Sequence, residues 1–369
     1  MKNNINFSIL LFLLLNFSAC KTAQQVSFTT LEKDWVLAPF EKVDSLNPIL
    51  KASTRNIFTC PILKKQVEWQ RKDVFNPAVV VRNGKIFMVY RAEDTIGKHA
   101  GTSRLGLAIS EDGLHFTTEI APVFYPDNDE MKIYEWEGGC EDPRIVESKD
   151  GTYIMTYTAY DGKTARLCLA TSTDLRHWTK QGLVLGEGKH RDAWSKSGAI
   201  VCKRDGEKMV AEKINSKYWM YWGDTNLYMA TSDDLIHWAA VENEKGELRK
   251  ALEPRSEGFD SGLVESGPYA LMTGKGILLI YNSANKGFIN ESKTNPENSY
   301  NAGQALFDLK NPLHLVARME KPFFQPDRPY EIQGQVNRVV FLEGLAYFKK
   351  SWFLYYGTAD SKIGVAVKR

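Results

Sequence analysis

The segment LAISEDGLHF at residues 107–116 recurs in altered form as LATSTDLRHW at 169–178 and MATSDDLIHW at 229–238. Each copy predicts a short apolar strand, a turn built on Ser-x-Asp, and an aromatic residue that packs back on the strand. The serines follow one another at intervals of 62 and 60 residues. A period near 60 fits a four-stranded propeller blade with an insertion, and about 300 residues then give five blades. The sequence therefore predicts an all-β fold, a five-bladed β-propeller.

Further apolar segments, about one per expected blade, favour the same fold. They combine aromatic with β-branched or other apolar residues between turn formers, as buried strands do. They are KIFMVYRA (85–92), TYIMTYTAY (152–160), KYWMYWG (217–223), GILLIYNSA (276–284) and SWFLYYGTA (351–359). The sequence shows no long run with a period of 3.6 residues, which predicts few helices. We expect the terminal segment SKIGVAVKR (361–369) to supply a strand that closes the ring.

The first 20 residues are typical of a targeting segment. A lysine near the start, an apolar run and small residues ahead of Cys20 indicate a secretory signal peptide. The ending FSAC resembles a bacterial lipobox, in which the cysteine is lipidated; an ordinary cleaved signal is the alternative. We therefore expect a signal peptide at 1–20, a lead segment at 21–65 and the propeller at 66–369. The predicted location is the cell envelope, on the periplasmic side.

Composition and charge exclude several classes of partner. The formal net charge is +2, from 47 basic and 45 acidic residues, so the chain has no strong basic or acidic excess and we expect no nucleic-acid partner. Hydrophobic residues make up 43% of the chain, which suits a globular protein with a sizeable core. The four cysteines besides Cys20 form no Cys-x-x-Cys pair, so we expect structural thiols and no zinc site. No motif calls for a cofactor or another metal, and the oligomeric state stays open.

The stretch GGCEDPRI at 138–145 places two adjacent acids between a pair of glycines and an arginine. The glycines allow a sharp turn, and Pro143 biases Asp142 toward an extended conformation. Side chains along an extended chain point alternately to opposite faces. We therefore expect Asp142 to act in a site, and Glu141 to point away and tie the loop to a backbone amide or to Arg144.

Polar residues next to apolar strands in successive blades can converge at the mouth of a propeller's channel. A charge at such a place is costly unless it is paired or functional. The candidates are Asn76, Arg91, Asp142, Asp224, Glu265 and Asp360, with Tyr134, Trp136, Trp194 and Trp222 as possible platforms for sugars. Carboxylates with arginine and asparagine suit glycoside cleavage with inversion, in which an acid protonates the leaving oxygen while a nucleophile attacks from the opposite face.

The motifs NPAV, VYR, GCEDPRI, FDSG and YYGTAD occur in this order and resemble those of glycoside hydrolase family 130 over roughly residues 65–369. The resemblance implies a propeller that cleaves β-mannosides with inversion. It also implies that Asp142 is the proton donor, which in the family's phosphorylases acts through a sugar hydroxyl. By the same match, Asn76, Arg91, Asp142 and Asp360 hold the mannose. Arg144 and Asp260, which lie in matched motifs, are predicted to bind substrate as well, and so is Asn282.

The basic motifs that bind phosphate in the family's phosphorylases are replaced in this chain. Asp224 stands where a His-Arg-Pro motif is expected, Asn282 stands in place of the histidine of Tyr-His-Gly, and Glu265 replaces a glycine. Carboxylates repel phosphate. We therefore expect an exported hydrolase of β-mannosides, with β-1,2 linkages as the best estimate. Glu265 is then the base that activates water, and Asp224 assists it or shares that role.

Two other functions remain alternatives to hydrolysis. A phosphorylase of β-1,4-mannosyl-N-acetylglucosamine or of mannooligosaccharides would release mannose 1-phosphate and bind phosphate through Lys213, Arg191 or Lys196. A non-catalytic glycan-binding lipoprotein would bind sugar without turnover. In each case the expected partner is a mannose-containing oligosaccharide, together with a membrane reached through a lipid on Cys20.

Overall fold

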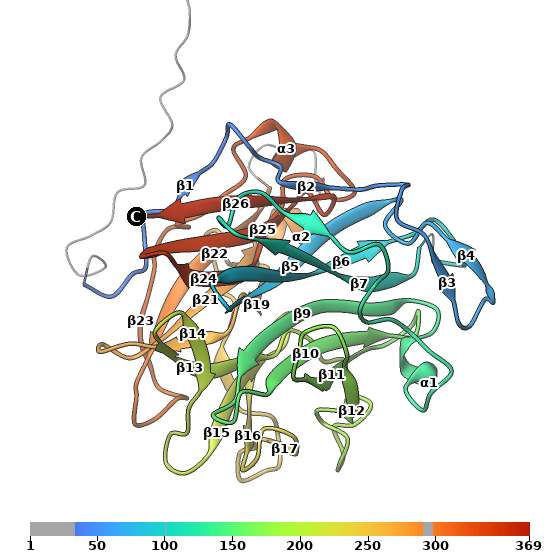
Figure 1. Cartoon of the computed structure of the whole chain (residues 1–369). Coiled ribbons are helices and arrows are strands. Elements are labelled where there is room, and N and C mark those ends of the chain that lie inside the picture. Colours follow the sequence, from blue (N-terminus) through green and yellow to red (C-terminus); the bar gives the residue numbers. More distant parts are fainter. Residues whose placement is uncertain (1–33, 100, 291–297) are drawn as a thin grey trace, which may run out of the picture.

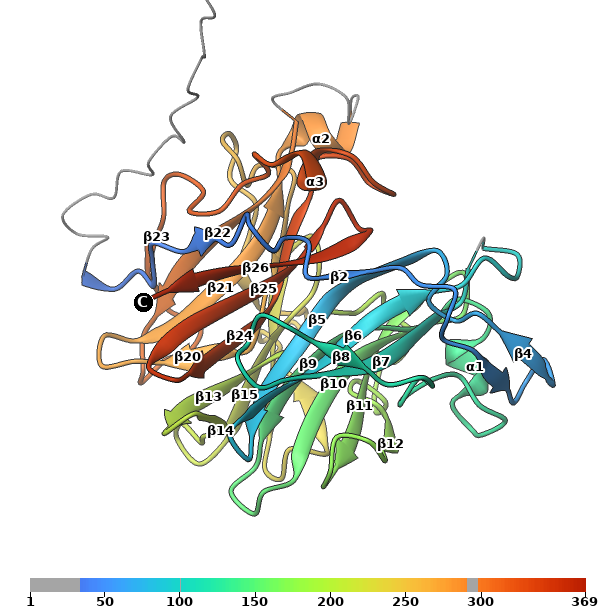
Figure 2. The same cartoon turned by 45° about the horizontal axis from the view of Figure 1, so that its top comes forward.

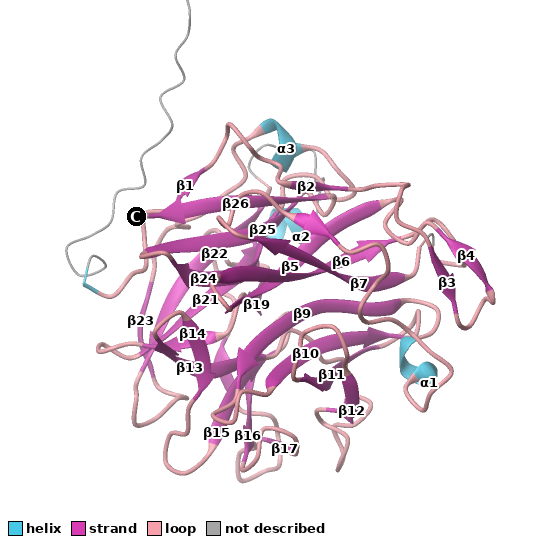
Figure 3. Cartoon of the chain, viewed as in Figure 1, coloured by secondary structure: helices cyan, strands magenta, loops and turns pink. Residues whose placement is uncertain are grey.

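The computed structural model describes residues 34–369, except residue 100 and residues 291–297 (Figure 1). Strands dominate these residues, and the few helices are one turn or little more (Figure 3). The helices are α1 (Lys132–Glu135), α2 (Lys286–Asn290) and α3 (Pro329–Ile332). The predicted all-β class is therefore confirmed. The predicted signal peptide and Cys20 lie outside the described residues. Within the described part of the chain, none of the helices has the length and apolarity needed to cross a membrane.

Consecutive strands pair antiparallel in groups that follow one another along the chain. The first group comprises β5 (Asp73–Arg82), β6 (Lys85–Glu93), β7 (Ser103–Ser110) and β8 (Thr117–Thr118). The second comprises β9 (Gly139–Glu147), β10 (Tyr153–Tyr160), β11 (Ala165–Ser172) and β12 (Thr179–Leu183). Short parallel contacts join neighbouring groups, as where Ser103 of β7 faces Gly139 of β9.

The remaining groups are built on the same antiparallel pairing. The next holds β13 (Ala199–Asp205), β14 (Lys208–Ala211), β15 (Tyr218–Trp222), β16 (Leu227–Ser232), β17 (Trp238–Ala240) and β18 (Lys250–Leu252). It is followed by β19 (Leu263–Ser266), β20 (Ala270–Met272), β21 (Ile277–Ala284), β22 (Tyr300–Phe307) and β23 (Leu315–Arg318). The last holds β24 (Val340–Phe348), β25 (Ser351–Thr358) and β26 (Lys362–Lys368), joined by β1 (Glu41–Lys42) and β2 (Leu50–Lys51). A separate hairpin pairs β3 (Phe58–Cys60) with β4 (Lys65–Val67).

The strands predicted from the apolar segments are present within a residue or two, as β6, β10, β15, β21 and β25. The terminal segment forms β26, which pairs with β25 on one side (Figure 2). On its other side β26 pairs with β1, so that Glu41 faces Val367 and Lys42 faces Ala366. The two ends of the described chain therefore meet in one sheet, as the sequence predicts.

The three repeated segments form the same turn after β7, β11 and β16. In each turn the serine hydroxyl accepts a hydrogen bond from the backbone N–H three residues on, at 2.8 Å for Ser110 and 2.9 Å for Ser172 and Ser232. The turn aspartate accepts backbone N–H groups and contacts the histidine three residues on. The repeat in the sequence is therefore a repeat of local structure.

The core lies between neighbouring groups of strands. One apolar cluster joins β5–β7 to β9–β11, where the rings of Phe124 and Tyr157 meet edge to face at 4.7 Å. A second joins β5 and β6 to β24–β26, and a third joins β13–β16 to β19–β22. Cys60, Cys140, Cys168 and Cys202 are buried free thiols. Because apolar side chains fill both faces of the sheets, the inner strands are held rigidly enough to position polar side chains.

Candidate active site

Three predicted site residues share a backbone conformation that the sequence did not indicate. Asn76, Asp142 and Asp360 lie in the left-handed region, at φ 48°, 48° and 49°. Asn and Asp tolerate this region better than other residues that carry a Cβ atom. Strand register shifts at Asn76 and at Asp142, as in a β-bulge. The extended conformation expected for Asp142 from Pro143 is therefore wrong, because a bulge re-aims the side chain.

Asp142 is the meeting point of the candidate site. Its carboxylate is 2% exposed. Its Oδ1 accepts a hydrogen bond from Asn76 Nδ2 at 2.8 Å and one from Arg91 Nη1 at 3.1 Å. Its Oδ2 lies 3.5 Å from Lys196 Nζ. Asn76, Arg91 and Asp142, predicted to converge, are thus in direct contact, and we call them, together with Glu141 and Lys196, the Asp142 cluster.

Arg91 connects the adjacent acids of the GGCEDPRI stretch. Its Nη2 donates to Glu141 Oε1 at 2.8 Å and to Glu93 Oε1 at 2.7 Å, and its Nε donates to Ser103 Oγ at 3.0 Å. Glu141 and Asp142 therefore hold the same guanidinium group. The expectation that Glu141 points away and ties down the loop through a backbone amide or Arg144 is wrong, because the bulge at Asp142 breaks the alternation of side chains.

Two glycines allow this arrangement by their lack of a Cβ atom. Gly139, at φ 119°, packs so closely on the main chain of Ser103 that a Cβ atom there would collide with it. A Cβ atom on Gly357 of β25 would lie 2.5 Å from Asn76 Oδ1. The glycines of GGCEDPRI and YYGTAD therefore make room for close approach around Asp142.

Arg144 supports the site from behind. Its guanidinium donates to three main-chain carbonyls, those of Gly267 at 2.7 Å, Ser266 at 2.8 Å and Asp142 at 3.1 Å. It is 3% exposed and lies 3.6 Å from Glu343 Oε1. The structure thus places Arg144 as a link between β9 and the end of β19.

Glu343 is a site-facing acid that sequence reasoning missed. It lies on β24 where the register shifts, and neither of its carboxylate oxygens has a hydrogen-bond partner among the described residues. Its position in the apolar run VVFLEGLAYF is the signal that points to it, because an acid within a buried strand needs a reason.

Glu265, the predicted base, has both carboxylate oxygens engaged. Oε1 accepts from Ser197 Oγ and lies 3.2 Å from Lys196 Nζ, and Oε2 accepts from Tyr300 OH at 2.7 Å. Lys196 thus contacts Glu265 as well as Asp142. Glu265 belongs to the site, and each of its carboxylate oxygens has a partner in this structure.

Asp224 lies at the edge of the site. Its Oδ2 accepts a hydrogen bond from the indole Nε1 of Trp194 at 2.8 Å. Both residues line a hollow of about 460 Å³ that also includes Asn226 and Tyr228. Burial opposes the charge of Lys196, but Glu265, Asp142 and Asp224 together raise the pKa of its ammonium group. Asp224 is therefore within electrostatic reach of the Asp142 cluster.

Asn282 and Asp260 make contacts that stabilise the surrounding strands rather than contacts within the Asp142 cluster. Asn282 donates to the Leu342 carbonyl at 2.9 Å and accepts from the Leu342 N–H at 2.8 Å, which ties β21 to β24. Asp260 lies 2.5 Å from Arg318 Nη2 and accepts from Tyr281 OH at 2.8 Å. Both side chains are fully buried. The structure therefore places these two predicted ligands in supporting contacts.

The acids of the site divide into two protonation classes. Burial opposes ionisation of Asp142, but Arg91 and Lys196 outweigh it and hold its pKa well below the usual range. Burial raises the pKa of Glu141 and that of Asp360 to about 7, and raises the pKa of Glu343 well above its usual value. A resting proton donor requires a raised pKa. In this site the raised pKa values belong to Glu141, Asp360 and Glu343 and not to Asp142.

This division lowers the negative charge of the site. The carboxylates are Glu93, Glu141, Asp142, Glu265, Glu343 and Asp360, and the cations are Arg91, Arg144 and Lys196. When Glu141, Asp360 and Glu343 carry protons, three carboxylates face three cations. Among the described residues, no group of three or more His, Cys, Asp or Glu side chains is arranged to hold a metal ion.

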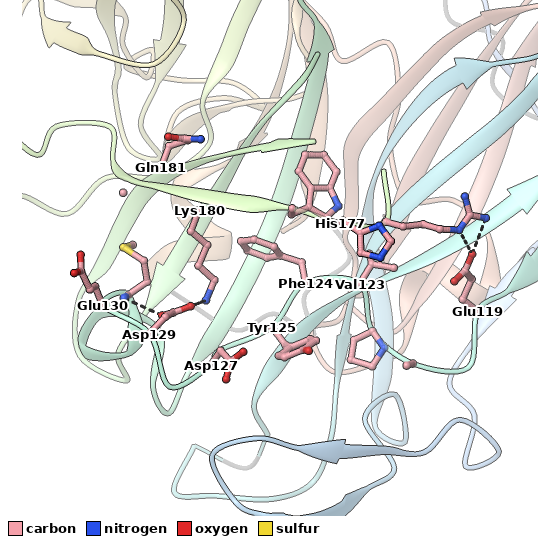
Figure 4. Close-up of a pocket in the computed structure, with 16 residues that line it drawn as sticks. Glu119, Val123, Phe124, Tyr125, Asp127, Asp129, Glu130, His177, Lys180 and Gln181 are labelled. Atoms are coloured by element: carbon pink, nitrogen blue, oxygen red, sulfur yellow. Dashed lines mark hydrogen bonds and ion pairs between the residues drawn. The ribbon is translucent and has the colours of Figure 1, made fainter. Parts of the chain in front are cut away.

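A larger hollow of about 800 Å³ lies away from these residues, along the segments around Phe124 and His177 (Figure 4). Four of its charged side chains form ion pairs with one another: Lys180 Nζ lies 2.9 Å from Asp129 Oδ2, and Arg176 Nη2 lies 2.8 Å from Glu119 Oε1. None of the predicted site residues lines it. The candidate site is thus recognised by polar side chains that converge, and not by the volume of a pocket.

Comparison with known proteins identifies the family. A family model described as β-1,4-mannooligosaccharide phosphorylase matches residues 41–369. A 1,2-β-oligomannan phosphorylase of a Thermoanaerobacter species is 35% identical over 317 residues, which cover 83% of this chain and 94% of that protein. A β-1,2-mannobiose phosphorylase of the same organism is 33% identical over 321 residues, with the same coverage.

Solved structures agree with this assignment. One is 45% identical with a TM-score of 0.87, and covers 91% of this chain and 95% of that chain. The description of that structure states that the GH130 family of mannoside phosphorylases contains glycoside hydrolases that target β-1,2 mannosidic linkages in Candida mannan. Its backbone agreement extends over almost the whole described chain.

The prediction of hydrolysis is contradicted by the curated relatives, because they are named as phosphorylases. Lys196, one of the three cations considered above for phosphate, places a positive charge between Asp142 and Glu265, beside the positions of the replaced basic motifs. The comparisons give no support to a lipid anchor or a periplasmic location. The match over residues 41–369 and the identity to curated relatives place this chain in glycoside hydrolase family 130, an enzyme family that acts on mannosides.

Proposed function

We propose that the protein cleaves β-1,2-linked mannooligosaccharides by phosphorolysis and releases mannose 1-phosphate. The names of the curated relatives support this reaction and this linkage. The structural observation that carries it is the position of Lys196, whose ammonium group contacts both Asp142 and Glu265. Of the three cations considered for phosphate, Arg191 donates to Tyr134 OH and Lys213 lies over the Tyr218 ring. Of these three, only Lys196 has a described contact with Asp142.

The substrate's terminal mannose is placed against Asn76, Arg91 and Asp360, next to Asp142. Asp142 takes up a proton and passes it, through a sugar hydroxyl, to the oxygen of the breaking bond. Phosphate attacks C1 from the opposite face, so the β-linked sugar leaves as α-mannose 1-phosphate and the rest of the chain keeps the glycosidic oxygen. Glu141, which shares Arg91 with Asp142 and has a pKa of about 7, is the nearby reserve of that proton.

Electrostatics make phosphate binding compatible with this acidic surrounding. A dianion next to six ionised carboxylates would be strongly repelled. Protonation of Glu141, Asp360 and Glu343 removes half of that negative charge, and Lys196 then attracts the anion. The groups of antiparallel strands are, in this proposal, the five blades of a propeller over residues 66–369, and β1 and β2 from the preceding segment join its last blade.

Product analysis tests the proposed function. Purified protein is incubated with β-1,2-mannobiose with and without inorganic phosphate, and the products are separated by chromatography. We expect mannose 1-phosphate and mannose in equal amounts, formed only with phosphate, and no product with Asp142→Asn. Free mannose formed at the same rate in both buffers, with no sugar phosphate, would overturn the proposal.

A further inference from the structure

Three aromatic side chains form a row beside the candidate site. The rings of His99 and Tyr160 lie 6.1 Å apart, and the rings of Tyr160 and Trp194 lie 6.5 Å apart at 69°. His99 follows β6, Tyr160 ends β10, and Trp194 precedes β13, so the row crosses from one group of strands to the next. We call these three residues the aromatic row.

Trp194 is the most informative member of the row because it is held in place yet open to solvent. It is 51% exposed, whereas Trp222, also a candidate platform, is 1% exposed and belongs to the core. The indole N–H donates to Asp224, and the ring packs edge to face on Tyr160. A ring that is exposed to solvent and yet held by a hydrogen bond and a ring contact suits a binding platform.

The row is joined to the Asp142 cluster by short stretches of chain. Tyr160 pairs in register with Gly139, which precedes Asp142 by three residues on β9. Trp194 is two residues from Lys196, whose carbonyl accepts the N–H of Gly223 at 2.8 Å next to Asp224. The hollow of about 460 Å³ between Trp194 and Tyr228 therefore lies close to the site.

We infer that the aromatic row binds the part of a β-mannoside chain that lies beyond the sugars flanking the cleaved bond. The inference rests on the proposed function for the identity of the sugar. The apolar face of a pyranose ring packs on Tyr160 and Trp194, while its hydroxyls bond to the carboxylate of Asp224. The row thus makes the enzyme prefer longer oligosaccharides over the disaccharide.

Binding to a variant that cannot turn over tests this inference without dependence on phosphate. In the Asp142→Asn background, calorimetry measures the Kd of β-1,2-mannobiose and of β-1,2-mannotetraose. We expect the tetraose to bind about tenfold more tightly, and Trp194→Ala to abolish most of that difference. Trp194→Phe, which keeps a ring, retains most of it. Ile120→Ala, at a residue that is 70% exposed and outside the row, serves as the control and leaves the ratio unchanged.

The outcomes separate this inference from the proposed reaction. An unchanged ratio of the two Kd values in Trp194→Ala overturns the row as a binding surface, whichever acceptor the enzyme uses. A lost preference for the tetraose, combined with phosphate-independent release of mannose by the parent protein, upholds the row and overturns phosphorolysis. Failure of both sugars to bind to Asp142→Asn overturns the row and the choice of β-1,2-mannosides together.

Discussion

Asn76 Nδ2 donates a hydrogen bond of 2.8 Å to Asp142 Oδ1, although the residues belong to different groups of strands and are 66 positions apart. Both lie in left-handed bulges, and both precede a proline. The bond fixes one oxygen of the proposed proton donor and leaves the other to face Lys196. The backbone therefore sets the orientation of the carboxylate before any substrate binds.

Asn76→Ala removes this bond, and we expect kcat/KM for β-1,2-mannobiose to fall by about 10- to 100-fold. Asn83→Ala is the matched control, because Asn83 has φ 50° but lies exposed in the β5–β6 turn. Both variants carry alanine in left-handed backbone, so they share the backbone cost. Steady-state kinetics that show equal losses in the two variants would mean that the bond to Asp142 does not matter.

Gly357→Ala should disturb the same bond from behind. The new methyl group would lie 2.5 Å from Asn76 Oδ1, so Asn76 must move. We expect a loss of about 1–3 kcal/mol in the free energy of unfolding, together with reduced activity. Gly274→Ala is the comparison, since no described atom lies within 4 Å of the place that its new methyl group would take. Urea denaturation of both variants that gives the same midpoint would rule out the predicted clash.

Lys196→Gln should weaken the binding of phosphate more than the binding of sugar. Loss of the ammonium group removes the proposed attraction, so we expect the KM for phosphate to rise by about tenfold or more. The variant also leaves Asp142 and Glu265 without their shared cation, and its folding is checked by circular dichroism. Lys213→Gln, at an exposed lysine, is the control. A KM for phosphate that stays at the parent value would remove Lys196 from the anion site.

Asp360 should make stability depend on pH. Burial raises its pKa to about 7, above its ordinary value of 3.8, so the folded protein binds a proton that the unfolded chain has already lost. Stability from this group is complete below pH 4 and is lost as pH rises toward 7. Asp360→Asn keeps a residue suited to φ 49° and removes the titration.

Thermal unfolding measured at pH 4.5 and at pH 8 checks this dependence. We expect the asparagine variant to gain about 2 kcal/mol relative to the parent at pH 8, and much less at pH 4.5. Partial exposure of Asp360 keeps this figure below the value that the whole pKa shift would give. The same difference between variant and parent at both pH values would contradict a raised pKa.

Glu343 and Glu93 should respond differently to amidation. Burial raises the pKa of Glu343 well above its usual value, so Glu343→Gln replaces one neutral group by another. Glu93 contacts Arg91 at 2.7 Å and Lys72 at 2.8 Å, and Glu93→Gln breaks both ion pairs. At pH 7 we expect a change within about 1 kcal/mol for Glu343→Gln and a loss of about 3 kcal/mol for Glu93→Gln. Equal losses in urea denaturation would show that Glu343 is ionised.

The strands and their turns were predictable because they depend on local pattern. The Ser-x-Asp repeats and the apolar runs specify β7, β11 and β16 and their neighbours without knowledge of the rest of the chain. The convergence of Asn76, Arg91 and Asp142 was also predictable, because each interrupts an apolar strand. Polar residues within apolar strands, together with the family resemblance, therefore indicated the centre of the site.

The features of the site that could not be predicted from the sequence depend on contacts between distant groups of strands. The conformation before a proline suggested extended backbone for Asp142, whereas pairing with β10 imposes a bulge. The contacts of Glu265 with Ser197, Tyr300 and Lys196 likewise join residues that lie far apart in the sequence. Lys196 was one of three cations considered for phosphate, and only the fold shows that it lies between Asp142 and Glu265.

The acceptor of the mannosyl group is tested most directly by turnover of β-1,2-mannobiose with phosphate in water enriched in oxygen-18. Phosphorolysis predicts mannose 1-phosphate whose oxygens carry no label, because phosphate supplies the oxygen bound to C1. Mass spectrometry that shows free mannose with one heavy oxygen at C1, formed without sugar phosphate, would contradict the account.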